Sequence, residues 1–149
     1  MELSSEEKVG LVQEQLPRHF DLRRLSAHGY ELTNNKCAIR FLFDRREPAK
    51  FVITVANPEL ADDPGMNLHI LVHLFHARMP EGKDPCTSIG NLLATALRPL
   101  LDGDFSIRIK HDEIKDTFYD NIRAVLSLPE GSAVRRLYDD NDIRWLDEI

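Results

Sequence analysis

The sequence contains little cysteine and no long apolar run. Only Cys37 and Cys86 are present among 149 residues, without C-x-x-C spacing, which is too little for a disulfide framework or a common redox or zinc motif. We expect both to be reduced thiols. No stretch approaches the roughly 18 apolar residues of a membrane span, and the N-terminus has no basic segment followed by an apolar one. These absences favour a cytoplasmic protein.

Local catalytic motifs are also missing. The seven glycines are scattered, so neither type of Gly-rich phosphate-binding loop is present, and no serine lies in a G-x-S-x-G elbow. No spacing singles out a catalytic pair among the 25 acidic residues. The sequence therefore predicts no catalytic residue and no cofactor, and we expect that the protein is not an enzyme.

Negative charge exceeds positive charge. Lys and Arg total 19 against 25 for Asp and Glu, which gives a net charge of −6 and a pI near 5.5. This balance disfavours nucleic acids and anionic membranes as partners. A local exception is formed by Arg40, Arg45, Arg46 and Lys50. We interpret it as a solvated hairpin tip whose charges oppose aggregation of sheet edges.

The first half of the chain predicts one helix followed by strands. Residues 4–16 are amphipathic, Ser4 and Glu7 have capping-box spacing, and Pro17 ends the helix. Three β-rich runs at residues 30–33, 37–43 and 50–56 alternate with turn sequences and indicate an antiparallel meander. Ile39, Phe41 and Phe43 then point to one side of the sheet, and Leu42 points to the other.

The stretch at residues 68–77 is ambiguous. Its apolar residues fit a helix that buries Leu68, Leu71, Val72 and Phe75, and they fit equally well a fourth strand with alternating burial. The stretch is short and bounded by Pro and Gly, which slightly favours the strand.

The second half of the chain predicts three helices. Ser88 begins a core helix that extends to Leu101, residues 112–128 form a second amphipathic helix, and Ser132 caps a third. Helix, strands and helices in this order, at this length, predict one α+β domain over residues 1–149. Its core is an antiparallel meander of three or four strands, with the N-terminal helix and the C-terminal helices packed on one face.

Two functional alternatives rest on local patterns. His69, His73 and His76 share one side if residues 68–77 are helical, which would suit a small metal-binding enzyme or sensor. A solvated histidine face explains the same pattern, so no metal is predicted. The second alternative is a regulatory homodimer that assembles through a sheet edge or through the face from Leu92 to Leu101.

The C-terminus offers a candidate partner-binding site. Residues 139–149 contain five acidic residues against Arg144 alone, and they include the single tryptophan. An electronegative segment of this kind can steer a basic protein partner, and an aromatic side chain can anchor it. A solvated tail, with the tryptophan in the core, explains the same composition. The candidate residues are Asp139, Asp140, Asp142, Trp145, Asp147 and Glu148.

The whole layout resembles the bacterial immunity proteins of toxin–immunity systems. The features that carry the resemblance are the N-terminal helix, the meander from Tyr30 through Cys37–Arg45 to Phe51–Val55, the closing helices and the acidic charge. The resemblance implies a non-catalytic inhibitor that binds a cognate toxin and blocks its active site. The partner implied is a protein that we expect to be basic, such as a nuclease, since an acidic inhibitor suits a phosphate-binding surface.

Overall fold

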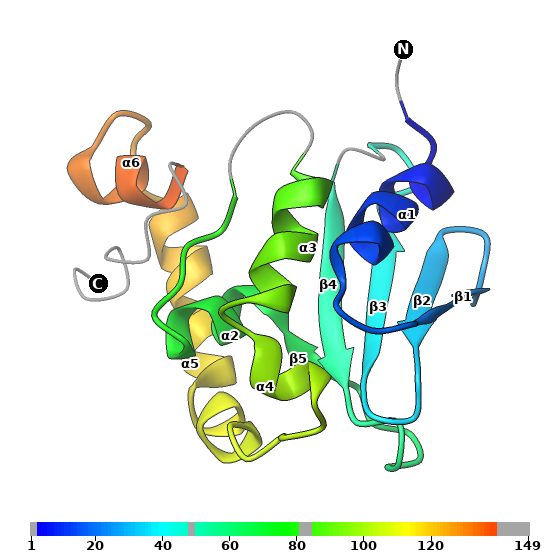
Figure 1. The fold of residues 1–149 in the computed structure, drawn as a ribbon. Helices are drawn as coiled ribbons and strands as arrows, with labels where there is room; N and C mark the ends of the chain where they lie inside the picture. The colour runs from blue at the N-terminus through cyan, green and yellow to red at the C-terminus, as the bar shows by residue number, and fades with distance from the viewer. Residues whose placement is uncertain (1–2, 48–49, 81–84, 140–149) are drawn as a thin grey trace.

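The computed structural model describes residues 3–47, 50–80 and 85–139 (Figure 1). It confirms the α+β fold with a meander sheet. The strands are β1 (Asp21–Arg24), β2 (Gly29–Thr33), β3 (Ala38–Phe43), β4 (Phe51–Ala56) and β5 (Met66–Asn67). The helices are α1 (Ser5–Gln15), α2 (Leu68–Leu74), α3 (Cys86–Ala94), α4 (Arg98–Leu101), α5 (Arg108–Leu126) and α6 (Ala133–Asp139).

The five strands form one antiparallel sheet in chain order. The register places Tyr30 opposite Phe41 and Phe41 opposite Ile53, so their side chains share one face. The predicted alternation is confirmed, because Phe41 is buried while Leu42 is 59% exposed. One face of the sheet therefore belongs to the core, and the other does not.

The outer strands β1 and β5 extend the meander beyond the three or four strands expected. The β1 sequence, Asp-Leu-Arg-Arg, is mostly charged and lacks β-branched residues, so it carries no strand signal. Strand β5 has only two residues, which is too short for any periodicity. Both strands exist because a neighbouring strand offers hydrogen-bonding partners, with Asp21 opposite Thr33 and Met66 opposite Val55.

Helix α1 begins as the sequence predicts. The Ser4 hydroxyl accepts a hydrogen bond from the Glu7 amide at 3.1 Å, and the Glu7 carboxylate accepts one from the Ser4 amide at 3.1 Å. This capping box satisfies two amides that have no partner within the helix. Val9 and Val12 are fully buried, so the helix turns its apolar side to the core.

Residues 68–74 form a helix, so the slight preference for a strand was wrong. The Asn67 side chain caps α2 by accepting a hydrogen bond from the His69 amide at 2.8 Å. Leu68, Ile70, Leu71 and Val72 are all buried. A helix wedged between the sheet and α5 can bury so many successive residues, whereas a strand at the sheet edge would expose every second one.

The predicted core helix from Ser88 to Leu101 is two helices. Helix α3 already begins at Cys86 and ends at Ala94, and α4 begins at Arg98. Pro99 explains the break, because a proline within a continuous helix has no amide to donate to residue 95 and clashes with that carbonyl. The side chain of Ser88 caps neither helix.

The later boundaries also differ from the prediction. Helix α5 begins at Arg108, four residues before the predicted start, and α6 follows Ser132 as expected. The Ser132 hydroxyl has no hydrogen-bond partner, so its side chain does not make the predicted cap. Both cysteines are buried and unpaired with each other, and burial raises the pKa of the Cys37 thiol to about 12.

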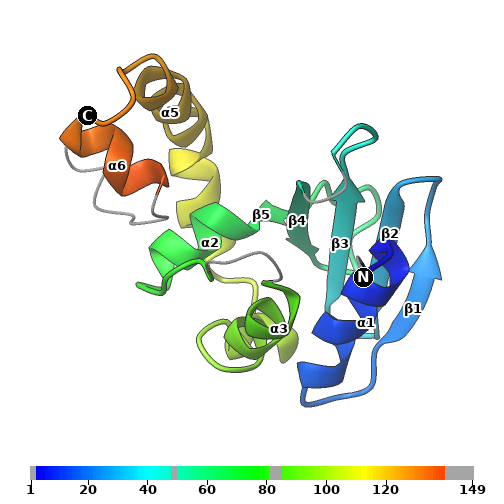
Figure 2. The same ribbon diagram turned by 90° about the horizontal axis from the view of Figure 1, so that it is seen from above.

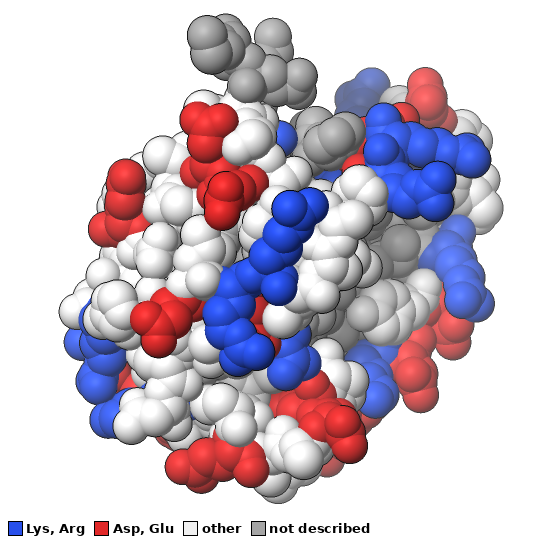
Figure 3. Space-filling view, turned by 90° about the vertical axis from the view of Figure 1, so that its right-hand side faces the viewer, with Lys and Arg blue, Asp and Glu red and all other residues white. Residues whose placement is uncertain are grey.

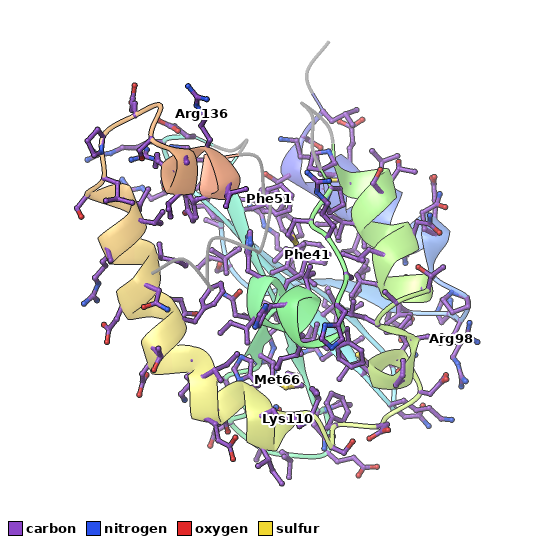
Figure 4. All side chains as sticks on the ribbon, turned by 90° about the vertical axis from the view of Figure 1, so that its left-hand side faces the viewer. Phe41, Phe51, Met66, Arg98, Lys110 and Arg136 are labelled. Carbon is purple, nitrogen blue, oxygen red and sulfur yellow. The ribbon has the colours of Figure 1, made fainter. Side chains whose placement is uncertain are left out.

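The helices divide into two groups around the sheet. Helices α1 and α3 pack against each other over the inner face of the sheet and share its main hydrophobic cluster with α4. Helices α5 and α6 lie beyond the β5 edge (Figures 1 and 2), where Phe118 and Val125 join Ile70 of α2 in a second cluster. Figure 4 shows Phe41 and Met66 in the interior, whereas Arg98 and Arg136 lie at the periphery. Helix α2 therefore connects the two groups.

Across the residues that the structure describes, no helix combines the length and the apolar character that crossing a bilayer requires.

The contact between α1 and α3 depends on Gly90. A Cβ atom added there would lie 2.7 Å from the Val12 carbonyl oxygen and 2.7 Å from Gln15 Cβ. We expect Gly90→Ala to lower the free energy of unfolding by about 1–3 kcal/mol, because the helices must move apart. Urea denaturation measures the change.

Gly10→Ala is the matched control. Gly10 lies inside α1, and a Cβ atom there would have no neighbour within 4 Å. We expect this change to raise the free energy of unfolding by about 0.5–1 kcal/mol, since alanine favours the helix. Equal effects of the two substitutions would contradict the close approach of α1 and α3.

Candidate functional site

The predicted partner-binding residues are almost all outside the described part of the chain. Asp140, Asp142, Trp145, Asp147 and Glu148 fall there. Asp139 is the last residue of α6, and its side chain is not described. The C-terminal acidic site therefore stays a prediction.

The three histidines do not form a common helical face. His69 and His73 lie on α2, but the helix ends at Leu74, and His76 follows in a left-handed conformation with φ of 54°. Within residues 3–47, 50–80 and 85–139, no three His, Cys, Asp or Glu side chains are grouped so that they could hold a metal ion. The histidine alternative therefore gains no support from the geometry.

The helical face from Leu92 to Leu101 is used inside the molecule. Leu93, Leu97, Leu100 and Leu101 are all fully buried in the main hydrophobic cluster. A homodimer built on this face would have to open the core, so the structure does not favour this form of the dimer alternative. Burial of this helical face does not test a homodimer that assembles through the β1 edge of the sheet.

A buried ion pair ties the loop after β4 to the start of α5. The Asp63 carboxylate, only 2% exposed, lies 2.6 Å from the Arg108 guanidinium. It also accepts hydrogen bonds from the amides of Asn57 at 2.8 Å and Gly65 at 2.9 Å. Burial alone would raise the pKa of Asp63, but these two amides and Arg108 together hold it below the usual value.

His111 makes a second connection beside this ion pair. Its Nε2 atom accepts a hydrogen bond from the Asn67 amide at 3.0 Å, so the proton of the neutral ring is on Nδ1. Nδ1 then donates to the Asp112 carboxylate at 2.9 Å, and this hydrogen bond lowers the pKa of Asp112. The ring is 3% exposed. Only the contact with Asn67 joins β5 to α5, because Asp112 lies on α5 itself.

Arg108, His111 and Asn67 line a groove of about 530 Å³ between β4, β5 and α5. Within this lining, Asn67 both caps α2 and donates to the Tyr119 hydroxyl at 3.1 Å. The arrangement fits a structural joint that holds α5 against the edge of the sheet.

A row of charges crosses the outer face of the sheet toward the same joint. The Glu31 carboxylate on β2 lies 2.9 Å from Arg40 Nε on β3 and 3.5 Å from Arg23 on β1. Arg40 also donates to the backbone carbonyl of Asp63. The loop that holds Asp63 is thereby attached to the middle of the outer face.

The end of the outer face near the turn between β3 and β4 carries exposed apolar side chains. A hollow of about 620 Å³ is lined by residues 26–28, 42–45 and 50–52, and we name this area the Leu42 surface. Leu42 and Val52 are opposite each other on β3 and β4 and are 59% and 50% exposed. Their inward-facing neighbours Phe43 and Phe51 stack with a centroid distance of 5.0 Å. The exposed side chains of Leu42 and Val52 are therefore carried by strands whose inner side is well packed.

Cations outnumber acidic side chains around this apolar area, although Asp44 also lines the hollow. Arg45, Arg46 and Lys50 are exposed on the turn between β3 and β4, and Arg24 is exposed on β1. In Figure 3, which looks at the side where β1 lies, Lys and Arg side chains form one group near the centre and another at the upper right, with uncharged surface between them. Acidic side chains in that view lie mostly at the left and the bottom.

The sequence contains a signal for the Leu42 surface. Alternation on β3 places Leu42 opposite to the core residues, and Val52 on β4 follows the same rule. Two apolar residues on the solvent side of neighbouring strands were a reason to expect a contact surface. Their pairing across the sheet depends on the register, which the sequence left open.

Comparisons with known proteins do not identify the chain. It matches no known protein family, no curated protein and no solved structure.

The Asp63 ion pair makes stability depend on pH in a defined direction. We expect Asp63→Asn to lower the free energy of unfolding by about 1.5–3 kcal/mol at pH 7, because Arg108 and two amides lose a charged acceptor. The pKa of Asp63 is lowered by folding. The contribution of Asp63 to the free energy of unfolding is therefore complete above its unfolded-state pKa of ~4. This contribution disappears as the pH falls through its folded-state pKa.

Urea denaturation of the wild type and the variant between acidic and neutral pH measures this effect. The difference between the two should be constant above about pH 5 and shrink below about pH 4. Asp62→Asn is the control, since Asp62 is exposed and its left-handed backbone conformation suits asparagine. A pH-independent difference for Asp63→Asn would contradict the role of the ion pair.

Proposed function

We propose that this protein is a non-catalytic protein-binding module and that it acts as an immunity protein, which binds and neutralises a cognate toxin. The observation that carries the proposal is the Leu42 surface, where cations outnumber acidic side chains around exposed apolar side chains. Protein interfaces commonly combine an apolar centre with a charged rim in which arginine is enriched. Leu42 and Val52, each at least half exposed, provide such a centre.

The rigidity of the platform supports the same proposal. Strands β3 and β4 are central in the sheet, and their inward side chains Ile39, Phe41 and Val55 are buried. A surface that is already ordered loses little conformational entropy when a partner binds. An inhibitor of this kind works by occupying the toxin's surface, and the chain needs no reactive group of its own for that.

The architecture and the charge of the chain are consistent with this role. The helix, the meander and the closing helices are the layout on which the resemblance to immunity proteins rests. The net charge of −6 favours encounter with a basic toxin, for which the acidic residues 139–149 remain a candidate contact.

Neutralisation is tested with the protein encoded by the neighbouring open reading frame in the source genome. We expect its induced expression to arrest bacterial growth and co-expression of this chain to restore it, with a stable complex in size-exclusion chromatography. The Gly10→Ala variant is the control, since its change is inside α1 and away from the proposed surface. Arrest that co-expression does not relieve, with no complex, would contradict the immunity function.

The acidic C-terminal segment has its own test in the same complex. Reversing the charges of Asp139, Asp140, Asp142, Asp147 and Glu148 should weaken binding more than about tenfold, or roughly 1.4 kcal/mol. The association rate of the wild type should also fall as salt is raised, because salt screens electrostatic steering. Binding affinity that stays within about twofold after charge reversal would mean that this segment is not the contact.

A further inference from the structure

We propose that the Leu42 surface binds an acidic segment of the partner protein, with a large apolar side chain of that segment seated in the hollow. The inference rests on the proposed function and specifies the chemistry of the contact. The acidic segment is a local feature of the partner and is compatible with a basic net charge of the whole partner.

The shape and polarity of the hollow define the apolar part of the ligand. The hollow has a volume of about 620 Å³, and Leu42 and Val52 line it side by side across the β3–β4 register. Both side chains are at least half exposed. A leucine, phenylalanine or tryptophan side chain would cover them, which removes apolar surface from water on both partners.

One cation is fixed in place on the β1 side of the hollow. Arg24 donates hydrogen bonds to the carbonyls of Ser26 at 3.1 Å and Ala27 at 3.2 Å, and its guanidinium lies 5.9 Å from the centre of the Tyr30 ring. Ser26 and Ala27 line the hollow. The position of this charge beside the hollow is therefore set by the fold and needs no ordering on binding.

The turn between β3 and β4 provides arginine side chains, and both acidic side chains of the turn already make contacts within it. The Asp44 carboxylate accepts hydrogen bonds from the Arg46 amide at 2.8 Å and the Glu47 amide at 2.9 Å. Glu47 pairs with Lys50 at 2.9 Å. Among the described residues, no acidic side chain pairs with the guanidinium of Arg45 or Arg46. These two groups are available to carboxylates of a partner, which arginine binds in a bidentate manner.

The available aromatic groups favour a peptide over a nucleic acid. Single-stranded nucleic acids bind through exposed aromatic rings on which bases stack. Here the rings of Tyr30 and Phe43 are 7% and 3% exposed, and Phe51 is half-buried. Phosphates could pair with the arginines, but they would leave the apolar hollow unfilled. Carboxylates around one apolar side chain satisfy both parts of the surface.

The test uses short synthetic peptides and the full chain. The first peptide carries several Asp and Glu residues around a central leucine, the second replaces its acids by Asn and Gln, and the third replaces its leucine by serine. Heteronuclear NMR titration locates the site and gives Kd. We expect the first peptide to shift amides of residues 26–28, 42–46 and 50–52 and the other two to bind at least about fivefold more weakly.

Variants of the chain test the two parts of the surface separately. The double variant Arg45→Glu with Arg46→Glu should weaken binding of the first peptide at least about tenfold, and Leu42→Ser at least about fivefold. The matched controls are Lys110→Glu with Arg123→Glu for charge and Ile109→Ser for apolar exposure, all on α5. Ile109 is 71% exposed. The controls should change Kd by less than about twofold.

Several results would overturn the inference. One is the absence of binding by the first peptide at about 1 mM and low salt. Others are equal binding of all three peptides, tighter binding of an oligothymidylate of the same charge, or self-association of the chain that Leu42→Ser abolishes. The last result would identify a second copy as the occupant.

The growth assay separates this inference from the proposed function. If the wild-type chain neutralises the toxin and the Leu42→Ser and Arg45→Glu/Arg46→Glu variants do so equally well, the function stands and the inference fails. If the wild-type chain neutralises nothing while the peptides bind as expected, the contact stands and the immunity function fails.

Discussion

Burial of one face of the meander is the constraint on which the rest of the structure depends. Leu32, Ile39 and Val55 are fully buried beneath helices α1 and α3, which approach each other closely at Gly90. Because side chains alternate along a strand, covering one face commits every second residue to the other. Leu42 and Val52 are exposed for that reason, and the same packing keeps the strands beneath them rigid.

Polar groups connect the second group of helices to this layer. The Asp63–Arg108 ion pair joins α5 to the loop after β4, and the hydrogen bond from the Asn67 amide to His111 joins α5 to β5. Each buried polar atom in these contacts has a directed partner, so the position of α5 is specific where apolar packing alone would tolerate several. The groove beside them is a consequence of this joint, and the exposed contact chemistry lies at the other end of the sheet.

The two surfaces considered for binding have opposite charge. The C-terminal segment is acidic, whereas the Leu42 surface carries Arg24, Arg45 and Arg46. A chain with a net charge of −6 can still hold a cationic area, because screening limits the reach of each charge to about 8 Å in physiological salt. Net charge therefore guides expectations on long-range encounter, and local charge decides which segment of a partner fits.

The sequence alone determined the local elements with strong signals: the capped helix α1, the central strands β2 to β4 and the α+β class. These follow from capping, β-branched runs and alternation, which act over a few residues. Tertiary structure decided whether residues 68–74 were a strand or a helix, formed β1 and β5, and paired Asp63 with Arg108 across 45 positions. Contacts between distant segments set those outcomes, because short or evenly apolar stretches have no strong preference of their own.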